Sequence, residues 1–370
     1  MMKKLTFISF VVLAVLSGCA KVTETSDGPT IFFAVGQRPF ATRADEQSLV
    51  TYEDVTSFKS RAWLHAEGVP GYQEIFGAGQ SEVISWDGSS EWSPSREYYW
   101  PKSSLSYIDF VSWYGNGTGN TAIDPTISYT WDSTTERASV SLGWTNFDAT
   151  SGTERLLYAD VAWRFNTNSA LYHKDNAAVT GVPTLFHHAL AKIIFRAISL
   201  TETAEDGTEF DVTVTGFSLS GVYTRGSMSL TNTDEGILSK QQNWTPAVPE
   251  WTSLANNSDP ITVSYNPAHV VDTDEYTVFV DNRSVIPQSV EDKEVTLDYT
   301  VKTTYTSGVI VDEIMHATIP LSSFDGGITE WAAGTKYTYT INIRSDTGAI
   351  TIVPEAKDWV PGYEGSVKIE

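Results

Sequence analysis

The sequence predicts a mostly β protein, built as two antiparallel β-sandwich domains in tandem. Thr, Val, Tyr, Ile and Trp recur in short runs that Gly, Asn, Asp and Pro interrupt, a pattern typical of strands and turns. The sequence has neither a long amphipathic helix pattern nor a fixed-period repeat. Its 370 residues, of which 41% are hydrophobic, are enough for two domains that each bury a core.

The charge and the cysteine content exclude several classes of protein. Asp and Glu number 46 against 24 Lys and Arg, so the formal net charge is −22. Nucleic acid and anionic membrane surfaces would repel such a chain, and we expect no nucleic-acid partner. Cys19 is the single cysteine, which excludes an intrachain disulfide, a Cys-based zinc site and a CxxC redox pair.

Residues 1–19 have the pattern of an export signal. Lys3 and Lys4 give a positive start, an apolar run covers residues 5–16, and two small residues precede Cys19. This run is too short to cross about 30 Å of hydrocarbon as a helix. The pattern therefore predicts a signal peptide and not a stable transmembrane anchor.

The segment 20–47 is predicted to contain a tether, an isolated strand and an exposed loop. Residues 21–28 are polar and small, as in flexible linkers. Residues 30–35 form an apolar run of strand length. Residues 37–47 include Arg38 and Arg43 and have no apolar periodicity, which indicates an exposed loop.

Residues 48–180 are predicted to form the first sandwich, which the strand at 30–35 completes. The pair Asp87-Gly88 and the Gly- and Asn-rich run at 115–120 are turn sequences between its strands. The polar segment 166–181 is the predicted domain boundary. The expected strands cover residues 61–66, 82–86, 97–100, 107–114, 127–131, 138–144 and 156–163.

Residues 181–370 are predicted to form the second sandwich. A long strand over 184–200 and the alternating run 211–217 flank the tight-turn signal Asp206-Gly207, so we expect them to pair as a hairpin. Further strands are expected over residues 276–280, 295–305, 308–319, 336–343 and 349–353, and at the C-terminus. Alternation in the run 337–343 places four side chains on one face: Tyr337, Tyr339, Ile341 and Ile343.

The residues that enzymes and metal sites need do not converge in the sequence. Histidine occurs at positions 65, 173, 187, 188, 269 and 316, without metal-ligand spacing. His187 and His188 are adjacent, so on a strand they face opposite sides and cannot hold one ion together. The sequence contains no GxSxG motif and no phosphate-binding loop with a lysine. We therefore predict no catalytic residue, metal site or cofactor, while a pair of carboxylates brought together by the fold stays open.

Aromatic residues make up 12% of the chain, which leaves a sugar-binding alternative open. Exposed Trp and Tyr rings stack on sugar faces, whereas buried rings fill cores. Because most tryptophans of the first half fall on expected strands, core filling is the favoured interpretation. These tryptophans are at positions 63, 86, 92, 100, 113, 131, 144 and 163.

The end of the export signal resembles the lipobox of bacterial lipoproteins, in which the cysteine at the cleavage point carries lipid. On this resemblance, Cys19 becomes the lipidated first residue and holds the chain at a membrane. Ala20 is not acidic, which agrees with passage to the outer membrane. The lipoprotein-processing machinery is then an expected partner.

Five segments spread over nearly the whole chain form a recognisable set by their order and spacing. They are the lipobox ending in Cys19, Glu97-Tyr98-Tyr99-Trp100-Pro101, Leu156-Leu157-Tyr158-Ala159, His188-Ala189-Leu190-Ala191-Lys192-Ile193 and Tyr337-Thr338-Tyr339-Thr340-Ile341. Together they resemble the bacterial fimbrillin family, the type V pilins and their relatives. The resemblance implies two transthyretin-like β-sandwiches and a subunit of a surface pilus that supports adhesion.

The resemblance also implies an assembly route. A trypsin-like surface protease would remove the strand at 30–35, and another pilus subunit would donate a strand to the groove that opens. The expected cut follows Arg43, which precedes Ala44, whereas Arg38 precedes a proline. The expected donor is the C-terminal segment, with Val367 and Ile369 as alternating anchors. The precursor would be lipid-anchored at the outer membrane, and the processed chain would be part of a surface pilus.

Burial of the removable strand explains why its loss would drive association. Burying Ile31, Phe32, Phe33 and Val35 contributes roughly 1.5–3 kcal/mol each, or about 6–12 kcal/mol in sum before entropy. A whole domain is stable by only about 5–15 kcal/mol. The groove left behind would expose apolar side chains and unpaired backbone groups, which a donated strand covers. The alternative function is that of an intact surface lipoprotein that binds carbohydrate or a host ligand through exposed aromatic residues.

Overall fold

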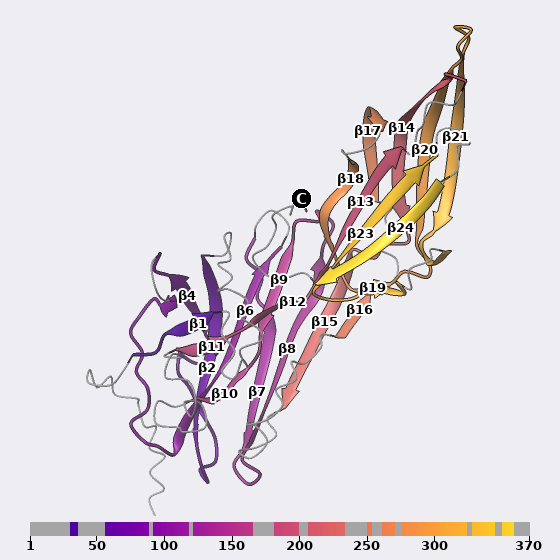
Figure 1. Ribbon diagram of the computed structural model, residues 1–370. Helices are drawn as coiled ribbons and strands as arrows, with labels where there is room; N and C mark the ends of the chain where they lie inside the picture. The colour runs from indigo at the N-terminus through magenta and orange to yellow at the C-terminus, as the bar shows by residue number, and fades with distance from the viewer. Residues whose placement is uncertain are drawn as a thin grey trace, which may run out of the picture.

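The computed structural model of the chain describes residues 30–35, 56–88, 92–117, 121–165, 181–199, 206–233, 250–253, 261–270, 276–323, 328–344 and 350–358. Most of these residues lie in β-strands, and the one helical element among them is the short 3-10 helix η2 (Leu321–Ser323). Within the same ranges no helix is long and apolar enough to span a membrane. The mostly β fold predicted from the sequence is confirmed, as two layered units arranged end to end (Figure 1).

The first unit contains a sheet that turns back around its own core. Its strands are β1 (Phe33–Val35), β2 (Ser57–Ala66), β3 (Gln73–Glu74), β4 (Glu82–Trp86), β5 (Trp92–Pro94), β6 (Ser106–Asn116), β9 (Arg155–Ala159), β10 (Ala162–Phe165), β11 (Val182–Thr184) and β12 (Phe186–His188). They follow the order β11-β1-β5-β4-β2-β6-β9-β12, with β10 on β6 and β3 on β2. The two ends of this path, β11 and β12, are separated in the chain by Leu185 alone, so the chain itself closes the sheet.

A second sheet packs on the first. It consists of β7 (Thr126–Asp132), β8 (Arg137–Asp148), β15 (Arg225–Thr233) and β16 (Glu250–Ser253), in the order β16-β15-β8-β7. Trp63 of β2 stacks on Tyr129 of β7 with ring centroids 4.6 Å apart, inside a core shared by both sheets. β15 and β16 come from residues after 180, yet they extend the sheet of β7 and β8. The division into residues 48–180 and 181–370 stays a prediction.

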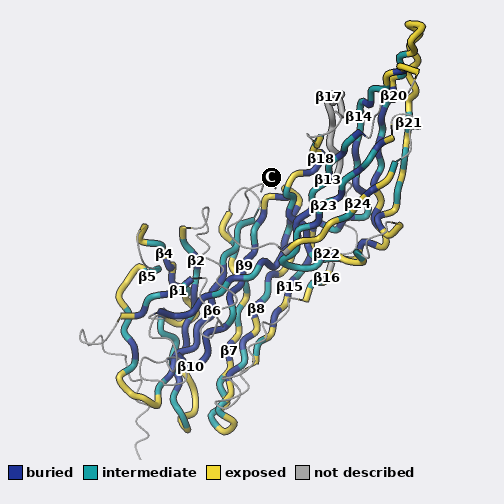
Figure 2. Tube along the Cα trace, viewed as in Figure 1, coloured by how far each residue is buried: buried dark blue, intermediate teal, exposed yellow. Residues whose placement is uncertain are grey.

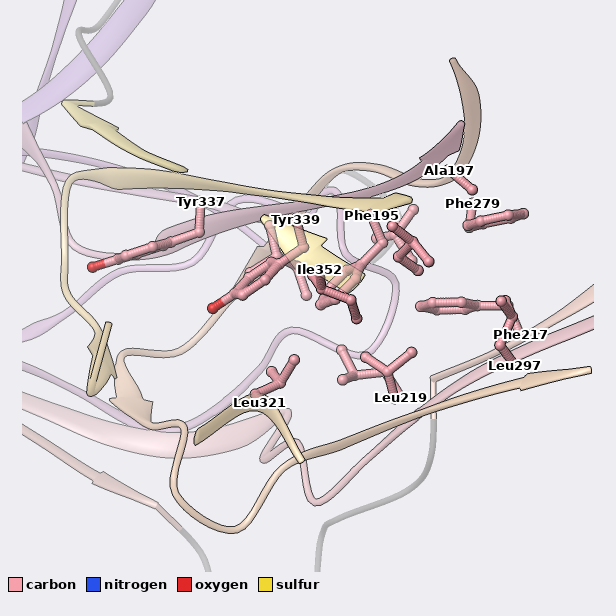
Figure 3. Packing of buried hydrophobic residues seen from close by; sticks show 14 of the residues in the cluster. Phe195, Ala197, Phe217, Leu219, Phe279, Leu297, Leu321, Tyr337, Tyr339 and Ile352 are labelled. Atoms are coloured by element: carbon pink, nitrogen blue, oxygen red, sulfur yellow. The ribbon is translucent and has the colours of Figure 1, made fainter. Parts of the chain in front are cut away.

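The second unit is a sandwich of two four-stranded sheets. One contains β13 (Ala191–Ser199), β18 (Thr277–Val285), β23 (Thr335–Ile343) and β24 (Ile350–Asp358), in the order β18-β13-β23-β24. The other contains β14 (Glu209–Ser220), β17 (Ile261–Val270), β20 (Glu294–Thr304) and β21 (Ile310–Pro320), in the order β17-β14-β20-β21. Figure 3 shows Phe195 and Tyr339 of the first sheet facing Phe217 and Leu219 of the second. A short ribbon of β19 (Gln288–Ser289) and β22 (Glu330–Trp331) lies beside this core.

The alternation predicted for residues 337–343 is confirmed, because its four apolar side chains are all buried in this core. Phe195 stacks on Tyr339 with ring centroids 4.6 Å apart. Trp331 of β22 is fully buried, and its Nε1–H donates to the Tyr339 hydroxyl at 2.8 Å. Burial raises the pKa of Tyr339 to about 12, so this hydroxyl stays neutral at physiological pH.

The hairpin predicted around Asp206-Gly207 is wrong. β13 pairs with β18 and β23, whereas β14 pairs with β17 and β20. The two strands lie in opposite sheets, where Phe195 and Phe217 meet across the core at 5.5 Å. Alternation identifies which side chains of a strand face a core, but it does not say whether the next strand lies beside it or opposite it.

Two strand pairs depart from the predicted antiparallel arrangement. β1 runs parallel to β11, and β13 runs parallel to β23. Parallel neighbours need a long connection, and in both pairs the two strands lie more than a hundred residues apart in the chain. Such pairing leaves no short-range signal in the sequence.

Candidate functional site: the β1 seat

The β1 seat is the place that residues 30–35 occupy between β5 and β11. Phe33, Ala34 and Val35 pair in parallel with Val182, Pro183 and Thr184, and Phe33 is also opposite Trp92 of β5. Beyond the strand itself, the Ile31 amide donates to the Tyr98 carbonyl at 2.7 Å, and the Val182 amide donates to the Phe32 carbonyl at 2.8 Å. A segment from near the N-terminus therefore fills an internal position of the sheet and forms hydrogen bonds on both sides.

The side chains of this segment alternate between the core and the outer face. Ile31, Phe33 and Val35 are 2%, 2% and 6% exposed, whereas Phe32 and Ala34 are half-buried. Phe33 meets Phe58 and Phe110 edge to face, with ring centroids 5.6 Å away in each case. Figure 2 shows β1 in the buried interior of the first unit. Three of the four predicted strand residues thus contribute fully to the core, and Phe32 contributes less than expected because it points to the other face.

Gly181 makes the close approach of β1 to β11 possible. A Cβ atom at this position would lie 2.9 Å from Cδ2 of Phe32 and 3.0 Å from its carbonyl oxygen. Contacts this short do not occur for ordinary Cβ atoms, so any side chain at position 181 would push the segment out of its place. Gly181 therefore provides the room for both the backbone and the ring of Phe32.

Glu82 fixes the other wall of the seat. Its buried carboxylate accepts hydrogen bonds from the Ser95 amide at 3.0 Å and from the Tyr98 hydroxyl at 2.9 Å, and it also binds the Ser95 hydroxyl. The Arg96 guanidinium lies 3.7 Å from the same carboxylate. Burial and the hydrogen bond to Glu82 raise the pKa of Tyr98 to about 12. These bonds hold the segment that pairs with Thr30 and Ile31 independently of those residues.

The other predicted site residues lie outside the described residues. They are the lipidation residue Cys19, the processing residues Arg43 and Ala44, and the donor anchors Val367 and Ile369. Their roles stay predictions. Of the predicted functional set, the structure describes only the strand residues.

The histidines and tryptophans occupy positions that suit a structural role. The His187 Nε2 lies 2.8 Å from the Asp160 carboxylate, while the side chain of the adjacent His188 is buried, so the two face different surroundings, as predicted. Burial lowers the pKa of His188 well below its usual value. Among the described residues, no group of three or more His, Cys, Asp or Glu could hold a metal ion. Six of the ten tryptophans whose burial is described are buried and four are half-buried, which agrees with core filling.

Sequence comparison identifies the family. The sequence model described as "Fimbrillin-like" matches residues 65–359, well over half of the chain. The chain belongs to the fimbrillin-like family. A search of curated proteins finds no match. Membership confirms the resemblance seen in the sequence.

Solved structures of fimbrial proteins are similar to this chain at low identity. A fimbrial protein from Bacteroides vulgatus is 15% identical, with 90% of this chain and 99% of that chain covered and a TM-score of 0.48. The tip fimbrial protein Mfa3 from Porphyromonas gingivalis, with a C-terminal truncation, is 11% identical, with 90% and 100% covered and a TM-score of 0.33. A structure described as a candidate cell-adhesion protein from Bacteroides uniformis is 12% identical, with 91% and 99% covered and a TM-score of 0.44.

Most residues that surround β1 in this fimbrillin-like chain could not be identified from the sequence. The predicted boundary ends at residue 181 and the next predicted strand begins at residue 184. The sequence therefore predicts no separate strand at β11, because Val182, Pro183 and Thr184 are too few to show a period. Gly181 followed a polar stretch and looked like a loop residue. A glycine directly before a short apolar run is a signal for close backbone approach, and it is the one local signal that could have located the seat.

Proposed function

We propose that the chain is a structural or accessory subunit of a cell-surface pilus, assembled by removal of its N-terminal strand and donation of a strand by a neighbouring subunit. The observation that carries the proposal is the β1 seat. Ile31, Phe33 and Val35 complete a core whose other strands all lie between residues 57 and 188. Without them, β11 loses its one sheet partner among the described strands, and β5 loses one of its two.

The loss of β1 would leave a surface that is unfavourable in water. The three inward side chains contribute about 1.5–3 kcal/mol each when buried, and unpaired backbone groups of β11 and β5 add to the loss. The walls of the seat have their own support, since β4 and Glu82 hold β5 and the following segment. An opened seat of this kind favours binding of another extended segment, because the same hydrogen bonds and apolar contacts can form again.

Export and anchoring form the first part of the proposed route. The signal pattern of residues 1–19 and the lipobox-like cysteine support a precursor held at the outer membrane by lipid on Cys19. Cleavage after Arg43 would separate this anchor, together with β1, from the rest of the chain. The cut would release the chain for surface assembly and open the seat in one step. The route requires lipoprotein-processing machinery and a trypsin-like surface protease as partners.

The proposed donor is the C-terminal segment that follows β24. Among the described strands, β24 pairs with β23 alone and lies at a sheet edge, and most of its described side chains are exposed. Asp358, its last residue, is opposite Thr335, and 12 residues follow it in the sequence. At about 3.3 Å per residue, these residues extend roughly 40 Å, and release of β24 adds roughly 30 Å. The segment is thus long enough to reach a neighbouring subunit, with Val367 and Ile369 as its apolar anchors.

The mature N-terminus tests the proposed processing. Sequencing of protein sheared from the cell surface should give Ala44 as the first residue. A lipidated Cys19 on the surface protein would contradict the proposal and support the intact lipoprotein. The Arg43→Ala variant should accumulate as the lipidated precursor and should not polymerise. Polymer formed by that variant would show that a cut at Arg43 is unnecessary.

Truncation tests the donor. A chain that ends before Gly365 should fold, keep its N-terminal processing and fail to extend a polymer. Filaments of normal length from this variant would exclude the C-terminal segment as the donor. A chain with Val367→Ala and Ile369→Ala is the milder matched change, which keeps the length and removes only the apolar anchors.

A further inference from the structure

β21 and β24, two of the four edge strands of the second sandwich, differ in how they are protected. β24 carries Pro354, Glu355 and Lys357 within its length, and these residues oppose pairing with another strand. The hairpin of β20 and β21 instead has a stretch of seven residues, 305–311, without any charge. Four of these are apolar and exposed: Tyr305, Val309, Ile310 and Val311. The β24 edge is therefore protected against pairing, whereas the β21 edge is open.

The end of the β20–β21 hairpin projects beyond the sandwich, at the end of the molecule farthest from the first unit (Figure 1). All residues from 305 to 314 are exposed, and Figure 2 shows this tip as a continuous exposed stretch. Ile314 is 87% exposed, more than any other large hydrophobic residue among those described. Met315, Ala317 and Ile319 pack against the core, so the outer face of β21 carries Ile310, Asp312, Ile314, His316 and Thr318.

We propose that β21 is a self-association edge, at which two copies of the chain pair antiparallel about a twofold axis that passes through Ile314. In this register Ile314 of one copy lies opposite Ile314 of the other. Asp312 of each copy lies opposite His316 of its partner, and Ile310 lies opposite Thr318. The sheet β17-β14-β20-β21 of one copy then continues into the same sheet of the other copy.

Charge complementarity selects this register and a second copy as the occupant. A twofold axis through Asp312 or Glu313 places a carboxylate opposite itself, which is unfavourable in a cross-strand pair. The axis through Ile314 places each Asp312 opposite His316 of the other copy. The His316 Nδ1 lies 2.6 Å from the Asp298 carboxylate of its own chain, so Nε2 is the nitrogen that can meet Asp312. In this register Glu313 faces the neutral Met315. The register also covers the most exposed hydrophobic residue. The strand thus complements itself in sequence, which an unrelated partner would have no reason to match.

This pairing goes beyond the proposed pilus function. It uses neither the β1 seat nor the C-terminal segment, and it needs no cleavage at Arg43. Its failure would leave strand donation untouched, and failure of strand donation would leave this pairing intact. If strand donation also occurs, the β21 contact joins two subunits through the far ends of their second sandwiches, with their first units pointing away from each other (Figure 1).

A cysteine trap tests the register directly. The full-length chain with Cys19→Ser has no cysteine, so Ile314→Cys adds a single thiol on the proposed axis. Opposite residues of an antiparallel pair have Cα atoms about 4.5–5.5 Å apart, within the range that a disulfide spans. Mild oxidation should convert Ile314→Cys into a covalent dimer, while Val353→Cys on β24, also exposed, should form no covalent dimer. Equal dimer from both variants, or none from Ile314→Cys, would overturn the proposal.

Sedimentation velocity tests the interface without a cross-link. The uncleaved Arg43→Ala chain should dimerise in about 0.15 M salt, where charges more than about 8 Å apart are screened. Ile314→Lys should weaken the dimer at least about tenfold and leave the circular dichroism spectrum unchanged, since this side chain is already in solvent. Val353→Lys should leave dimerisation unchanged. A chain that is monomeric at every concentration, or one that Ile314→Lys does not weaken, would contradict the proposal.

Discussion

β1 and β24 lie near opposite ends of the chain, and their environments are opposite as well. β1 occupies an internal position of its sheet and places Ile31, Phe33 and Val35 in a core. β24 lies at a sheet edge, and Ile352 is the one buried side chain among those described in it. Loss of β1, near one terminus, should thus destabilise the fold strongly, whereas release of β24, near the other terminus, should destabilise it little. This asymmetry is what exchange of strands between subunits requires.

The largest expected difference between the two strands is in stability. Phe33→Ala should lower the free energy of unfolding of the first unit by about 3–5 kcal/mol, because it removes a ring that contacts Phe58 and Phe110 in a closed core. Val353→Ala, the matched change on β24, should alter stability by less than about 0.5 kcal/mol, since its side chain is exposed. Urea unfolding followed by tryptophan fluorescence measures both. Similar losses for the two variants would remove the distinction between the strands.

A smaller effect is expected at the wall of the seat. Gly181→Ala should destabilise the first unit by about 1–3 kcal/mol, because its Cβ would overlap the ring and carbonyl of Phe32. Adding Phe32→Ala should recover part of this loss, and a double-mutant cycle should give a coupling of about 1 kcal/mol. Strictly additive effects would mean that Gly181 does not accommodate the Phe32 ring.

The smallest expected effect is a pH dependence at the Glu82 side of the seat. The pKa of Tyr98 is raised in the folded chain to about 12 from 10.0, so the folded state favours the neutral phenol. Its contribution is complete below pH 10 and is lost as the pH rises toward 12. Stability should therefore fall less steeply over this range in Tyr98→Phe than in the unchanged chain. If stability falls equally steeply with pH in both chains, Tyr98 does not contribute to this pH dependence. The pKa of Tyr107 is also raised to about 12. Because both chains contain Tyr107, its contribution to the pH dependence cancels when the two slopes are compared.

Features that depend on neighbouring residues could be predicted from the sequence, whereas contacts between distant segments could not. Alternation over 337–343 correctly indicated which side chains enter a core, because that information is local. The apolar run 30–35 indicated a strand, but it did not show that Phe32 points away from the core. The pairing of β1 with β11 was not predictable, since Phe33 and Val182 are distant in the chain and β11 has only three residues. The same limit produced the wrong hairpin around Gly207, where a tight turn leads into the opposite sheet. Resemblance to the family suggested the proposed role of the strand at 30–35, and the structure shows its neighbours in the sheet.

Amide hydrogen exchange at Val182 tests the central claim most directly, because its amide bonds to the Phe32 carbonyl across the β1 seat. In the intact chain this amide should be protected. After cleavage at Arg43 and removal of the N-terminal fragment, protection should be lost in monomers and should return in polymers. A Val182 amide that stays protected in cleaved monomers would mean that the seat closes by itself, and it would contradict the proposal that loss of β1 drives assembly.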